Sequence, residues 1–256
     1  MSTAQRPIVL ITGATSGFGL STAKKFAKNG YPLIITGRRS ERLEALKEEL
    51  APFTRVYTHA LDVRDDKAVA GMVESLPKDF KDIAILVNNA GLALGTEPAN
   101  KASLSDWHTM IDTNVTGLVN VTHSLLPILC AQPSSTIINL SSIAANYAYP
   151  GSHVYGASKA FVAQFSKNLR SDFAGTGVRV TSLEPGLSES EFSLVRFGGD
   201  EEKYHSIYDN AHALQPEDIA DIIYWIAEQP AHININSLEV MPTSQACDNF
   251  KIVKHA

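Results

Sequence analysis

A tyrosine and a lysine four residues apart are the residues of this chain whose types and spacing most directly suggest chemistry. Tyr155 and Lys159 stand in the segment 154–161. On a helix this spacing brings both side chains onto one face. A phenol, whose pKa is ordinarily about 10, is a poor acid or base at neutral pH, but a nearby ammonium group stabilises the phenolate and lowers that pKa. The pair could therefore transfer a proton, although the same spacing also occurs on solvated helix faces, so other segments must support this interpretation.

Length and composition indicate one globular domain, residues 1–256. The chain of 256 residues is 44% hydrophobic and 19% charged, and its formal net charge is −5. This charge argues against nucleic acid or an anionic membrane as a partner. No apolar run approaches the roughly 18 residues of a membrane span, and none precedes the first predicted strand. We therefore expect a cytoplasmic protein with no membrane or nucleic-acid partner.

The cysteines and histidines give no metal-binding pattern. Cys130 and Cys247 lie far apart without a C-x-x-C motif, and no H-E-x-x-H motif is present. His205 and His212 are two helical turns apart, but no third ligand is evident. We expect no metal, and we expect Cys130 to be a small buried residue near the end of an apolar helix.

A glycine-rich turn follows the first predicted strand, residues 8–12, and leads into a predicted helix, residues 20–28. In this order the glycines allow close backbone approach, and the helix N-terminus presents unpaired N–H groups to an anion. The pattern predicts a dinucleotide phosphate site, with a turn that merely packs as the alternative. The residues expected to contribute are Gly13, Thr15, Ser16, Gly17, Phe18 and Gly19.

Two arginines follow the second predicted strand, residues 33–36. An acidic residue at this point would accept a hydrogen bond from the adenosine 2′-hydroxyl, but the chain has Arg38 and Arg39. Their forked donors suit a 2′-phosphate, which predicts NADP(H) as the cofactor. The alternative is that both arginines form the solvated start of a helix capped by Ser40 and running to residue 50.

Further candidate cofactor residues follow the third and fourth predicted strands, residues 55–59 and 84–87. The Asp62 carboxylate, next to Val63, could accept a hydrogen bond from an adenine amino group, and the small residues of the stretch Asn89, Ala90 and Gly91 allow close approach of the backbone. These residue types are also common in turns. Their position at the carboxyl ends of strands, where open α/β sheets bind ligands, favours the binding interpretation.

The second half of the chain continues the alternation and then departs from it. We predict a helix over 115–130 headed by Asn114, strands over 136–140 and 178–183, and an apolar tyrosine helix over 154–173 that could also contact a partner subunit. The segment of about 187–214 is polar and irregular, as in a lid or a mobile loop before the last helix, which begins at Pro216. A strand over 237–241 follows. The alternation predicts an α/β fold, a Rossmann-type doubly wound parallel sheet in a single domain with a lid-like insertion.

The chain resembles the short-chain dehydrogenase/reductase family over almost its whole length. The resemblance depends on motifs that occur in the family's order, namely Thr12-Gly13-x-x-x-Gly17-x-Gly19, Asn88-Asn89-Ala90-Gly91, Asn114, Ser142, Tyr155-x-x-x-Lys159 and Pro185-Gly186. Phe18 replaces the aliphatic residue more usual in the glycine turn. The resemblance implies an NADP(H)-dependent oxidoreductase acting on CH–OH groups, and a homo-oligomer, with a tetramer favoured.

The resemblance also implies roles for the matching residues. Tyr155 would protonate the carbonyl oxygen during reduction, and Lys159 would lower its pKa and hold the nicotinamide ribose. Ser142, preferred to Ser141 by its offset from Tyr155, would hydrogen-bond the substrate oxygen, and Asn114 would help to hold a proton-relay water. Pro185 and Gly186 would contact the cofactor.

Several segments resemble the branch of the family that oxidises serine and other 3-hydroxy acids or reduces malonic semialdehyde, to which reductases of sulfoacetaldehyde are similar. Each of these aldehydes carries an anionic group, and Arg196 in the lid-like segment is the candidate to bind it through paired hydrogen bonds. The alternative is that Arg196 is a solvated arginine of the lid. Phe250 in the tail is a further candidate substrate contact. The differences in the lid and the tail favour sulfoacetaldehyde, which would be reduced to isethionate. A hydroxy-acid dehydrogenase, a reductase of bulkier ketones or acyl-carrier substrates, and a non-catalytic dinucleotide sensor or structural partner remain alternatives.

Overall fold

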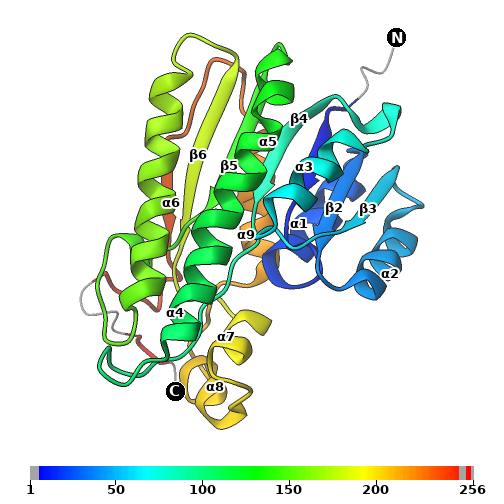
Figure 1. The fold of residues 1–256 in the computed structure, drawn as a ribbon. Coiled ribbons are helices and arrows are strands. Elements are labelled where there is room, and N and C mark those ends of the chain that lie inside the picture. The colour runs from blue at the N-terminus through cyan, green and yellow to red at the C-terminus, as the bar shows by residue number, and fades with distance from the viewer. Residues whose placement is uncertain (1–5, 248–251, 255–256) are drawn as a thin grey trace.

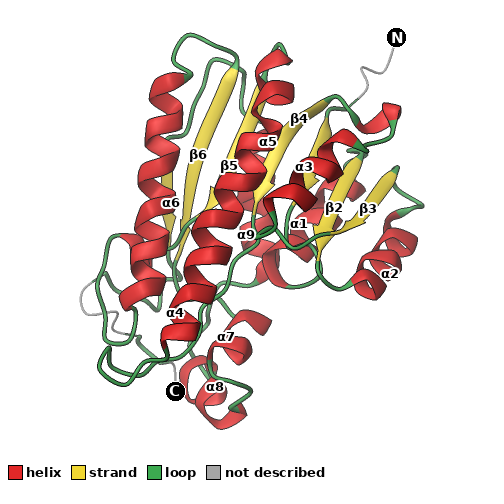
Figure 2. Ribbon diagram, in the orientation of Figure 1, coloured by secondary structure: helices red, strands yellow, loops and turns green. Residues whose placement is uncertain are grey.

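The computed structural model describes residues 6–247 and 252–254, in which strands and helices alternate along the chain (Figures 1 and 2). The strands are β1 Ile8–Ile11, β2 Leu33–Gly37, β3 Val56–Ala60, β4 Ile83–Asn88, β5 Ser135–Leu140, β6 Val178–Pro185 and β7 Ser237–Val240. The helices are α1 Gly17–Lys28, α2 Ser40–Leu50, α3 Asp66–Glu74, α4 Leu104–Ile111, α5 Gly117–Ala131, α6 His153–Asp172, α7 Glu191–Arg196, α8 Glu201–Tyr208 and α9 Pro216–Ala227.

The described strands form one parallel sheet in the order β3-β2-β1-β4-β5-β6-β7. The chain moves outward from β1 in one direction and then returns to continue from β4 in the other. At such a reversal the connections leave in opposite directions, which opens a crevice at the carboxyl ends of β1 and β4. The predicted doubly wound α/β fold is thus confirmed.

Both faces of the sheet are covered, because successive side chains of a strand point to opposite sides. On β1, Val9 and Ile11 belong to a core with residues of α1, α2 and α9, whereas Ile8 and Leu10 belong to a second core with residues of α3, α5 and α6. Figure 1 shows α5 and α6 in front of the sheet and α1 and α9 behind it. This burial on both sides explains why the strands read as continuous apolar runs.

A buried polar network joins the central strands to the helices in front of them. The Asn88 side-chain amide donates to Asn139 Oδ1 at 2.8 Å and to Thr122 Oγ1 of α5 at 2.9 Å. The Asn139 amide in turn donates to Ser166 Oγ of α6 at 2.9 Å. All four residues are buried, so these hydrogen bonds replace bonds that water would make, although Asn88 Oδ1 has no partner among the described residues. The network fixes α6, and with it Tyr155, relative to β5.

The helix predicted over 115–130 begins earlier and contains an irregularity. The stretch Leu104–Ala131 is continuous, with a π-helical turn at Asp112–Thr116 between α4 and α5. Asn114 therefore lies inside this turn, and its interpretation as a helix cap is wrong. By length and composition the stretch could cross a membrane, since its mean hydropathy in an 18-residue window is 1.2. However, α5 packs on the sheet as a core helix does, through its buried residues Leu118, Val121, Leu125 and Leu129.

Three other local expectations are corrected. The segment 187–214 is not irregular, since it contains the short helices α7 and α8, which lie beyond the carboxyl ends of the strands (Figure 1). Ser40 is the first residue of α2 and not its cap, which is Arg39. Cys130 is exposed, because it lies on the side of α5 that faces away from the sheet.

Replacing Asn139 by alanine should lower the free energy of unfolding by about 2–4 kcal/mol, because the amide groups of the buried network lose their partners and a cavity remains. Urea unfolding followed by circular dichroism measures this change. Asn100→Ala, at an exposed position, is the matched control and should change the free energy by less than about 0.5 kcal/mol. Equal effects of the two substitutions would contradict the structural role of the network.

Candidate active site

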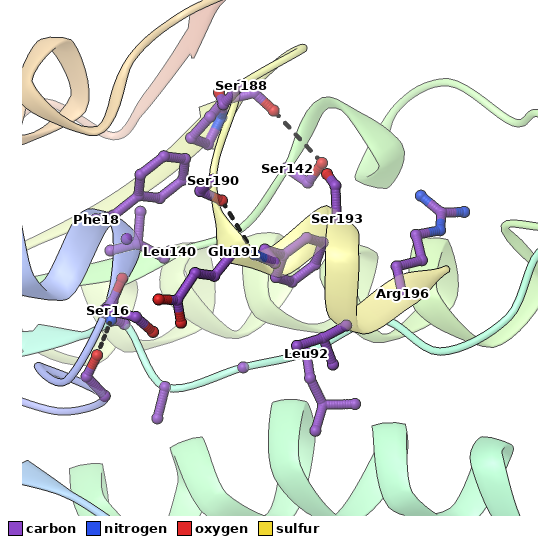
Figure 3. A pocket seen from close by; sticks show the side chains of 18 of the residues that line it. Ser16, Phe18, Leu92, Leu140, Ser142, Ser188, Ser190, Glu191, Ser193 and Arg196 are labelled. Atoms are coloured by element: carbon purple, nitrogen blue, oxygen red, sulfur yellow. Dashed lines mark hydrogen bonds between the residues drawn. The ribbon is translucent and has the colours of Figure 1, made fainter. Parts of the chain in front are cut away.

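A cavity of about 590 Å³ lies at the carboxyl ends of the strands, between the sheet and the lid-like segment (Figure 3). Sixteen of the residues predicted to bind the cofactor line it, namely Gly13, Thr15, Ser16, Gly17, Phe18, Arg38, Arg39, Asp62, Val63, Asn89, Ala90, Gly91, Tyr155, Lys159, Pro185 and Gly186. Two predicted residues, Gly19 and Asn114, are not among the residues that line it. Phe250 falls outside the described residues.

The glycine turn is shaped for a close approach of the backbone. Gly13 and Gly17 have φ values of +68° and +51°, which favour glycine. A Cβ atom on Gly19 would lie 2.4 Å from the Gly13 carbonyl oxygen and 2.5 Å from Asn89 Nδ2. Asn89 Nδ2 donates to the carbonyl oxygens of Thr12 and Gly13 at 2.9 and 3.1 Å, which holds the turn against the end of β4. The turn and the N-terminus of α1 thus form a cradle that suits a dinucleotide phosphate.

Arginines lie beside the glycine turn at one end of the cavity. Arg39 Nη2 donates to Thr15 Oγ1 at 2.8 Å and to Ser16 Oγ at 2.9 Å. Arg38 lines the cavity and makes no hydrogen bond or ion pair within the described part of the chain. Arg42, which was not predicted, donates to the Thr15 carbonyl oxygen at 3.4 Å. Its place in the first turn of α2, three residues after Arg39, was the sequence signal that could have identified it.

Asp62 is engaged by a neighbouring cation. Arg64 Nη2 lies 2.6 Å from Asp62 Oδ2, and the two form an ion pair. Hydrogen bonds from Arg64, assisted by smaller contributions that include the charge of Arg38, hold the pKa of the Asp62 carboxyl below its ordinary value. The predicted acceptor for an adenine amino group is therefore ionised, but Arg64 already occupies much of its hydrogen-bonding capacity.

Tyr155 and Lys159 lie together in the wall of the cavity, as their spacing on α6 predicts. Both are buried, and Lys159 Nζ lies 5.9 Å from the centroid of the Tyr155 ring. Lys159 Nζ donates to the Leu140 carbonyl oxygen at 2.7 Å. Ser142 lies close enough to the Tyr155 side chain to lower the pKa of the phenol, and its Oγ donates to the Pro185 carbonyl oxygen at 3.4 Å. Ser141 Oγ instead donates to the Lys159 carbonyl oxygen at 2.7 Å. The geometry therefore favours Ser142 over Ser141 as the hydroxyl that acts with Tyr155.

Burial moves the pKa values of the pair in opposite directions. It raises the pKa of Tyr155 well above its ordinary value, and the hydrogen bond from Ser142 and the charge of Arg196 offset this only in part. Burial lowers the pKa of Lys159 to about 8. The net pKa of Tyr155 is therefore raised, because desolvation of the phenol outweighs the groups that lower it; the expected effect of Lys159 on this pKa stays a prediction.

Asn114 braces the end of β4 against α6. Its Oδ1 atom accepts a hydrogen bond from the Leu92 N–H at 2.8 Å, and its amide donates to the Leu92 carbonyl oxygen at 2.8 Å and to Ser158 Oγ at 3.0 Å. A Cβ atom on Gly91 would lie 3.1 Å from Asn114 Oδ1 and 3.5 Å from Lys159 Nζ. Both N–H donors of the Asn114 amide are thus engaged with protein groups, and the role of Asn114 toward a relay water stays a prediction.

A cation from the lid-like segment lies beside the buried tyrosine. Arg196, the last residue of α7, has its guanidinium carbon 5.5 Å from the centroid of the Tyr155 ring, and its Nη1 donates to the Tyr149 hydroxyl at 3.0 Å. The Phe192 ring lies 5.8 Å from the Tyr155 ring. The structure thus brings Arg196 to the predicted acid, together with Tyr149, which lies in a loop and has no sequence signal that could have identified it.

The arrangement places an acid, a hydroxyl donor and a cation around one small space next to the phosphate cradle. It can bind a small anion through Arg196 while an oxygen of the same molecule meets Tyr155 and Ser142. Within residues 6–247 and 252–254, no group of three or more metal-ligating side chains is arranged to hold a metal ion.

Comparisons with known proteins agree with this geometry. The sequence profile of the family described as short chain dehydrogenase matches residues 7–196. Sulfoacetaldehyde reductase 2 of Chromohalobacter salexigens is 56% identical over 246 residues, which cover 96% of this chain and 98% of that protein. Serine 3-dehydrogenase of Agrobacterium fabrum is 54% identical over 248 residues, which cover 97% and 98% of the two chains.

A solved structure is also similar. The closed form of a serine dehydrogenase complexed with NADP⁺ superimposes with a TM-score of 0.91 at 50% identity, and the match covers 97% of this chain and all of that one. The profile match spans most of the chain, and the related proteins match from end to end. The chain therefore belongs to the short-chain dehydrogenase family and is an oxidoreductase.

Proposed function

We propose that this protein is an NADP(H)-dependent oxidoreductase that interconverts a small anionic aldehyde and its alcohol, with reduction of sulfoacetaldehyde to isethionate as the favoured reaction. The observation that carries the proposal is the position of the Arg196 guanidinium, 5.5 Å from the ring of the buried Tyr155. A substrate bound to this cation by its anionic group would extend only a short distance before its oxygen meets Tyr155.

NADP(H) suits the residues of the cradle. The glycine turn leaves room for a pyrophosphate next to backbone N–H groups, and Arg38 and Arg39 supply forked cationic donors for a 2′-phosphate, together with the hydroxyls of Thr15 and Ser16. The similar serine dehydrogenase was solved with NADP⁺. When bound, the nicotinamide supplies or accepts the hydride.

Tyr155 provides the proton that reduction requires. Its raised pKa keeps the phenol protonated at neutral pH, so that it can donate to the carbonyl oxygen as negative charge develops there. The Ser142 hydroxyl hydrogen-bonds the same oxygen, and Lys159, which is mostly protonated at neutral pH because its pKa is about 8, stabilises the phenolate that remains. Oxidation of the alcohol reverses these steps, with the phenolate as the base.

Arg196 selects the substrate by charge. A guanidinium binds a carboxylate or a sulfonate through paired hydrogen bonds, and these bonds strengthen where α7 and α8 exclude water. The lid sequence 187–191 and the identity to a sulfoacetaldehyde reductase support the sulfonate. The 54% identity to a serine 3-dehydrogenase supports the second candidate, a 3-hydroxy acid dehydrogenase or malonic semialdehyde reductase. A non-catalytic sensor is disfavoured, because Ser142, Tyr155 and Lys159 lie together.

We also propose a single catalytic domain, residues 1–256, that works as a cytoplasmic homo-oligomer, with a tetramer favoured. The exposed hydrophobic side chains of Leu104, Ile111 and Phe161 on α4 and α6 support association of subunits through these helices. The segment 187–214 serves as the lid, because α7 contributes Arg196 and Phe192 to the cavity wall. Sedimentation equilibrium measures the subunit number.

Tyr155→Phe should lower kcat by at least about 100-fold, because the proton donor is lost, while the Kd for NADPH stays within about threefold of the native value. NADPH absorbance gives the rate, and NADPH fluorescence gives the Kd. Tyr57→Phe, on β3 outside the cavity, is the matched control and should keep full activity. Activity retained in Tyr155→Phe would refute the assigned acid.

Arg196→Ala should lower kcat/KM for sulfoacetaldehyde and malonic semialdehyde by roughly 10- to 100-fold, because hydrogen bonds to a charged group are lost. For a neutral aldehyde such as propanal, kcat/KM should fall by less than about threefold. NADPH oxidation with the three aldehydes side by side measures this, and the native enzyme identifies the preferred anion. Arg55→Ala, far from the cavity, is the control. Equal losses would remove the proposed role of Arg196, and no turnover of either anionic aldehyde would refute the substrate.

The buried Lys159 should make stability depend on pH. In the folded protein it loses its proton near pH 8, whereas in the unfolded chain it keeps the proton to about pH 10.5. The unfolded state therefore binds more protons between these values, and raising the pH favours the folded state. The native protein should gain about 2 kcal/mol relative to Lys159→Met from pH 7 to pH 9.5. Lys167→Met, on the exposed side of α6, controls for removing a lysine. If the difference in the free energy of unfolding between the native protein and Lys159→Met stays constant across this pH range, the burial of a charged Lys159 is contradicted.

A further inference from the structure

The lid helix α7 carries a carboxylate that is bound to the arginines of the cofactor cradle. Glu191, its first residue, lies 3.1 Å from Arg42 Nη1 and 3.5 Å from Arg39 Nη1 through Oε2. The side chains of Glu191, Arg39 and Arg42 are 52%, 44% and 49% exposed, so solvent and other anions can reach them. Glu191 also lines the cavity. This ion pair is the contact of α7 with the part of the site that suits a 2′-phosphate.

Local geometry directs Glu191 to this place. The hydroxyl of Ser190 accepts a hydrogen bond from the Phe192 N–H at 3.4 Å and caps the start of α7. A Cβ atom on Gly17 would lie 3.6 Å from Ser190 Cβ, so the start of α7 lies against the glycine turn. Figure 3 shows Glu191 directed from α7 toward Ser16, whereas Arg196 projects from the other end of the same helix.

We propose that Glu191, which also contacts Arg42, competes with the 2′-phosphate of NADP(H) for Arg39. This competition weakens the preference for NADP(H) over NAD(H) and links cofactor choice to the lid. A phosphate with about two negative charges repels a carboxylate bound to the same guanidinium groups. A 2′-hydroxyl brings no such charge. Binding of the phosphorylated cofactor therefore displaces Glu191 from Arg39, and this frees the start of α7, whereas NAD(H) leaves the ion pair in place.

This inference rests on the proposed binding of the 2′-phosphate by Arg38 and Arg39. It adds that the lid, and not the arginines alone, contributes to the choice of cofactor. Helix α7 has six residues and also carries Arg196, the proposed substrate-binding cation. Binding of the 2′-phosphate can therefore affect Arg196 through this helix. The three-residue spacing of Arg39 and Arg42 allows one carboxylate to contact both side chains.

Glu191→Gln tests the competition, because it keeps the shape of the side chain and removes its charge. Fluorescence titration of the whole protein should show NADPH binding tighter by roughly three- to tenfold, the range of a half-exposed charge interaction, and NADH binding changed by less than about twofold. Glu202→Gln, an exposed lid residue of α8, removes the same charge and should change both by less than about twofold. Unchanged or weaker NADPH binding in Glu191→Gln, or an equal effect of Glu202→Gln, would overturn the inference.

Hydrogen exchange tests the link to the lid. The probe 2′,5′-ADP carries the 2′-phosphate without a nicotinamide, and ADP is its control. In the native protein 2′,5′-ADP should accelerate amide exchange in Glu191–Arg196, whereas ADP should not, and in Glu191→Gln neither should. Slower or unchanged exchange in the native protein with 2′,5′-ADP would refute displacement of Glu191.

Arg39→Ala distinguishes a failure of this inference from a failure of the proposed 2′-phosphate site. A loss of preference for NADPH over NADH in Arg39→Ala, without an effect of Glu191→Gln, would reject the competition alone. An unchanged preference in Arg39→Ala would reject the 2′-phosphate site itself.

Discussion

The site depends on the burial of two ionisable groups at the end of a sheet. Tyr155 and Lys159 are almost fully removed from solvent, and desolvation raises the pKa of the phenol and lowers that of the ammonium group. Both shifts favour the neutral form, so each charge that the reaction creates must be stabilised by groups already in place. Ser142, the Leu140 carbonyl oxygen and Arg196 lie next to this pair.

The doubly wound topology explains how distant segments supply these groups. Every strand of the parallel sheet ends at the same edge, so the glycine turn after β1, the arginines after β2 and the serines after β5 meet there without long connections. Helix α7 of the segment 187–214 lines the cavity, and its two ends contact the two halves of it. One half suits a dinucleotide and the other a small anion.

The features that could be predicted from the sequence were those encoded in neighbouring residues. Buried parallel strands read as apolar runs, and glycines with positive φ and a Tyr/Lys spacing on a helix are local patterns. The helices α7 and α8 were missed because helices of six and eight residues owe their stability to tertiary contacts. Tyr149 and the pairing of Glu191 with Arg42 depend on residues far apart in sequence, and the pKa of Tyr155 depends on burial that spacing cannot reveal.

The buried amide network has a consequence for how the central strands find their alignment. Asn88 of β4 pairs with Asn139 of β5 in register, among side chains that are otherwise apolar and similar in size. A slip of two residues would keep every side chain on its proper face and cost the apolar residues little, but it would bury both amides against hydrocarbon. The polar pair thus excludes the misaligned sheet. Because Asn89 and Ser142 follow β4 and β5 in the chain, the same pair also fixes the positions of these two residues relative to each other along the strand direction.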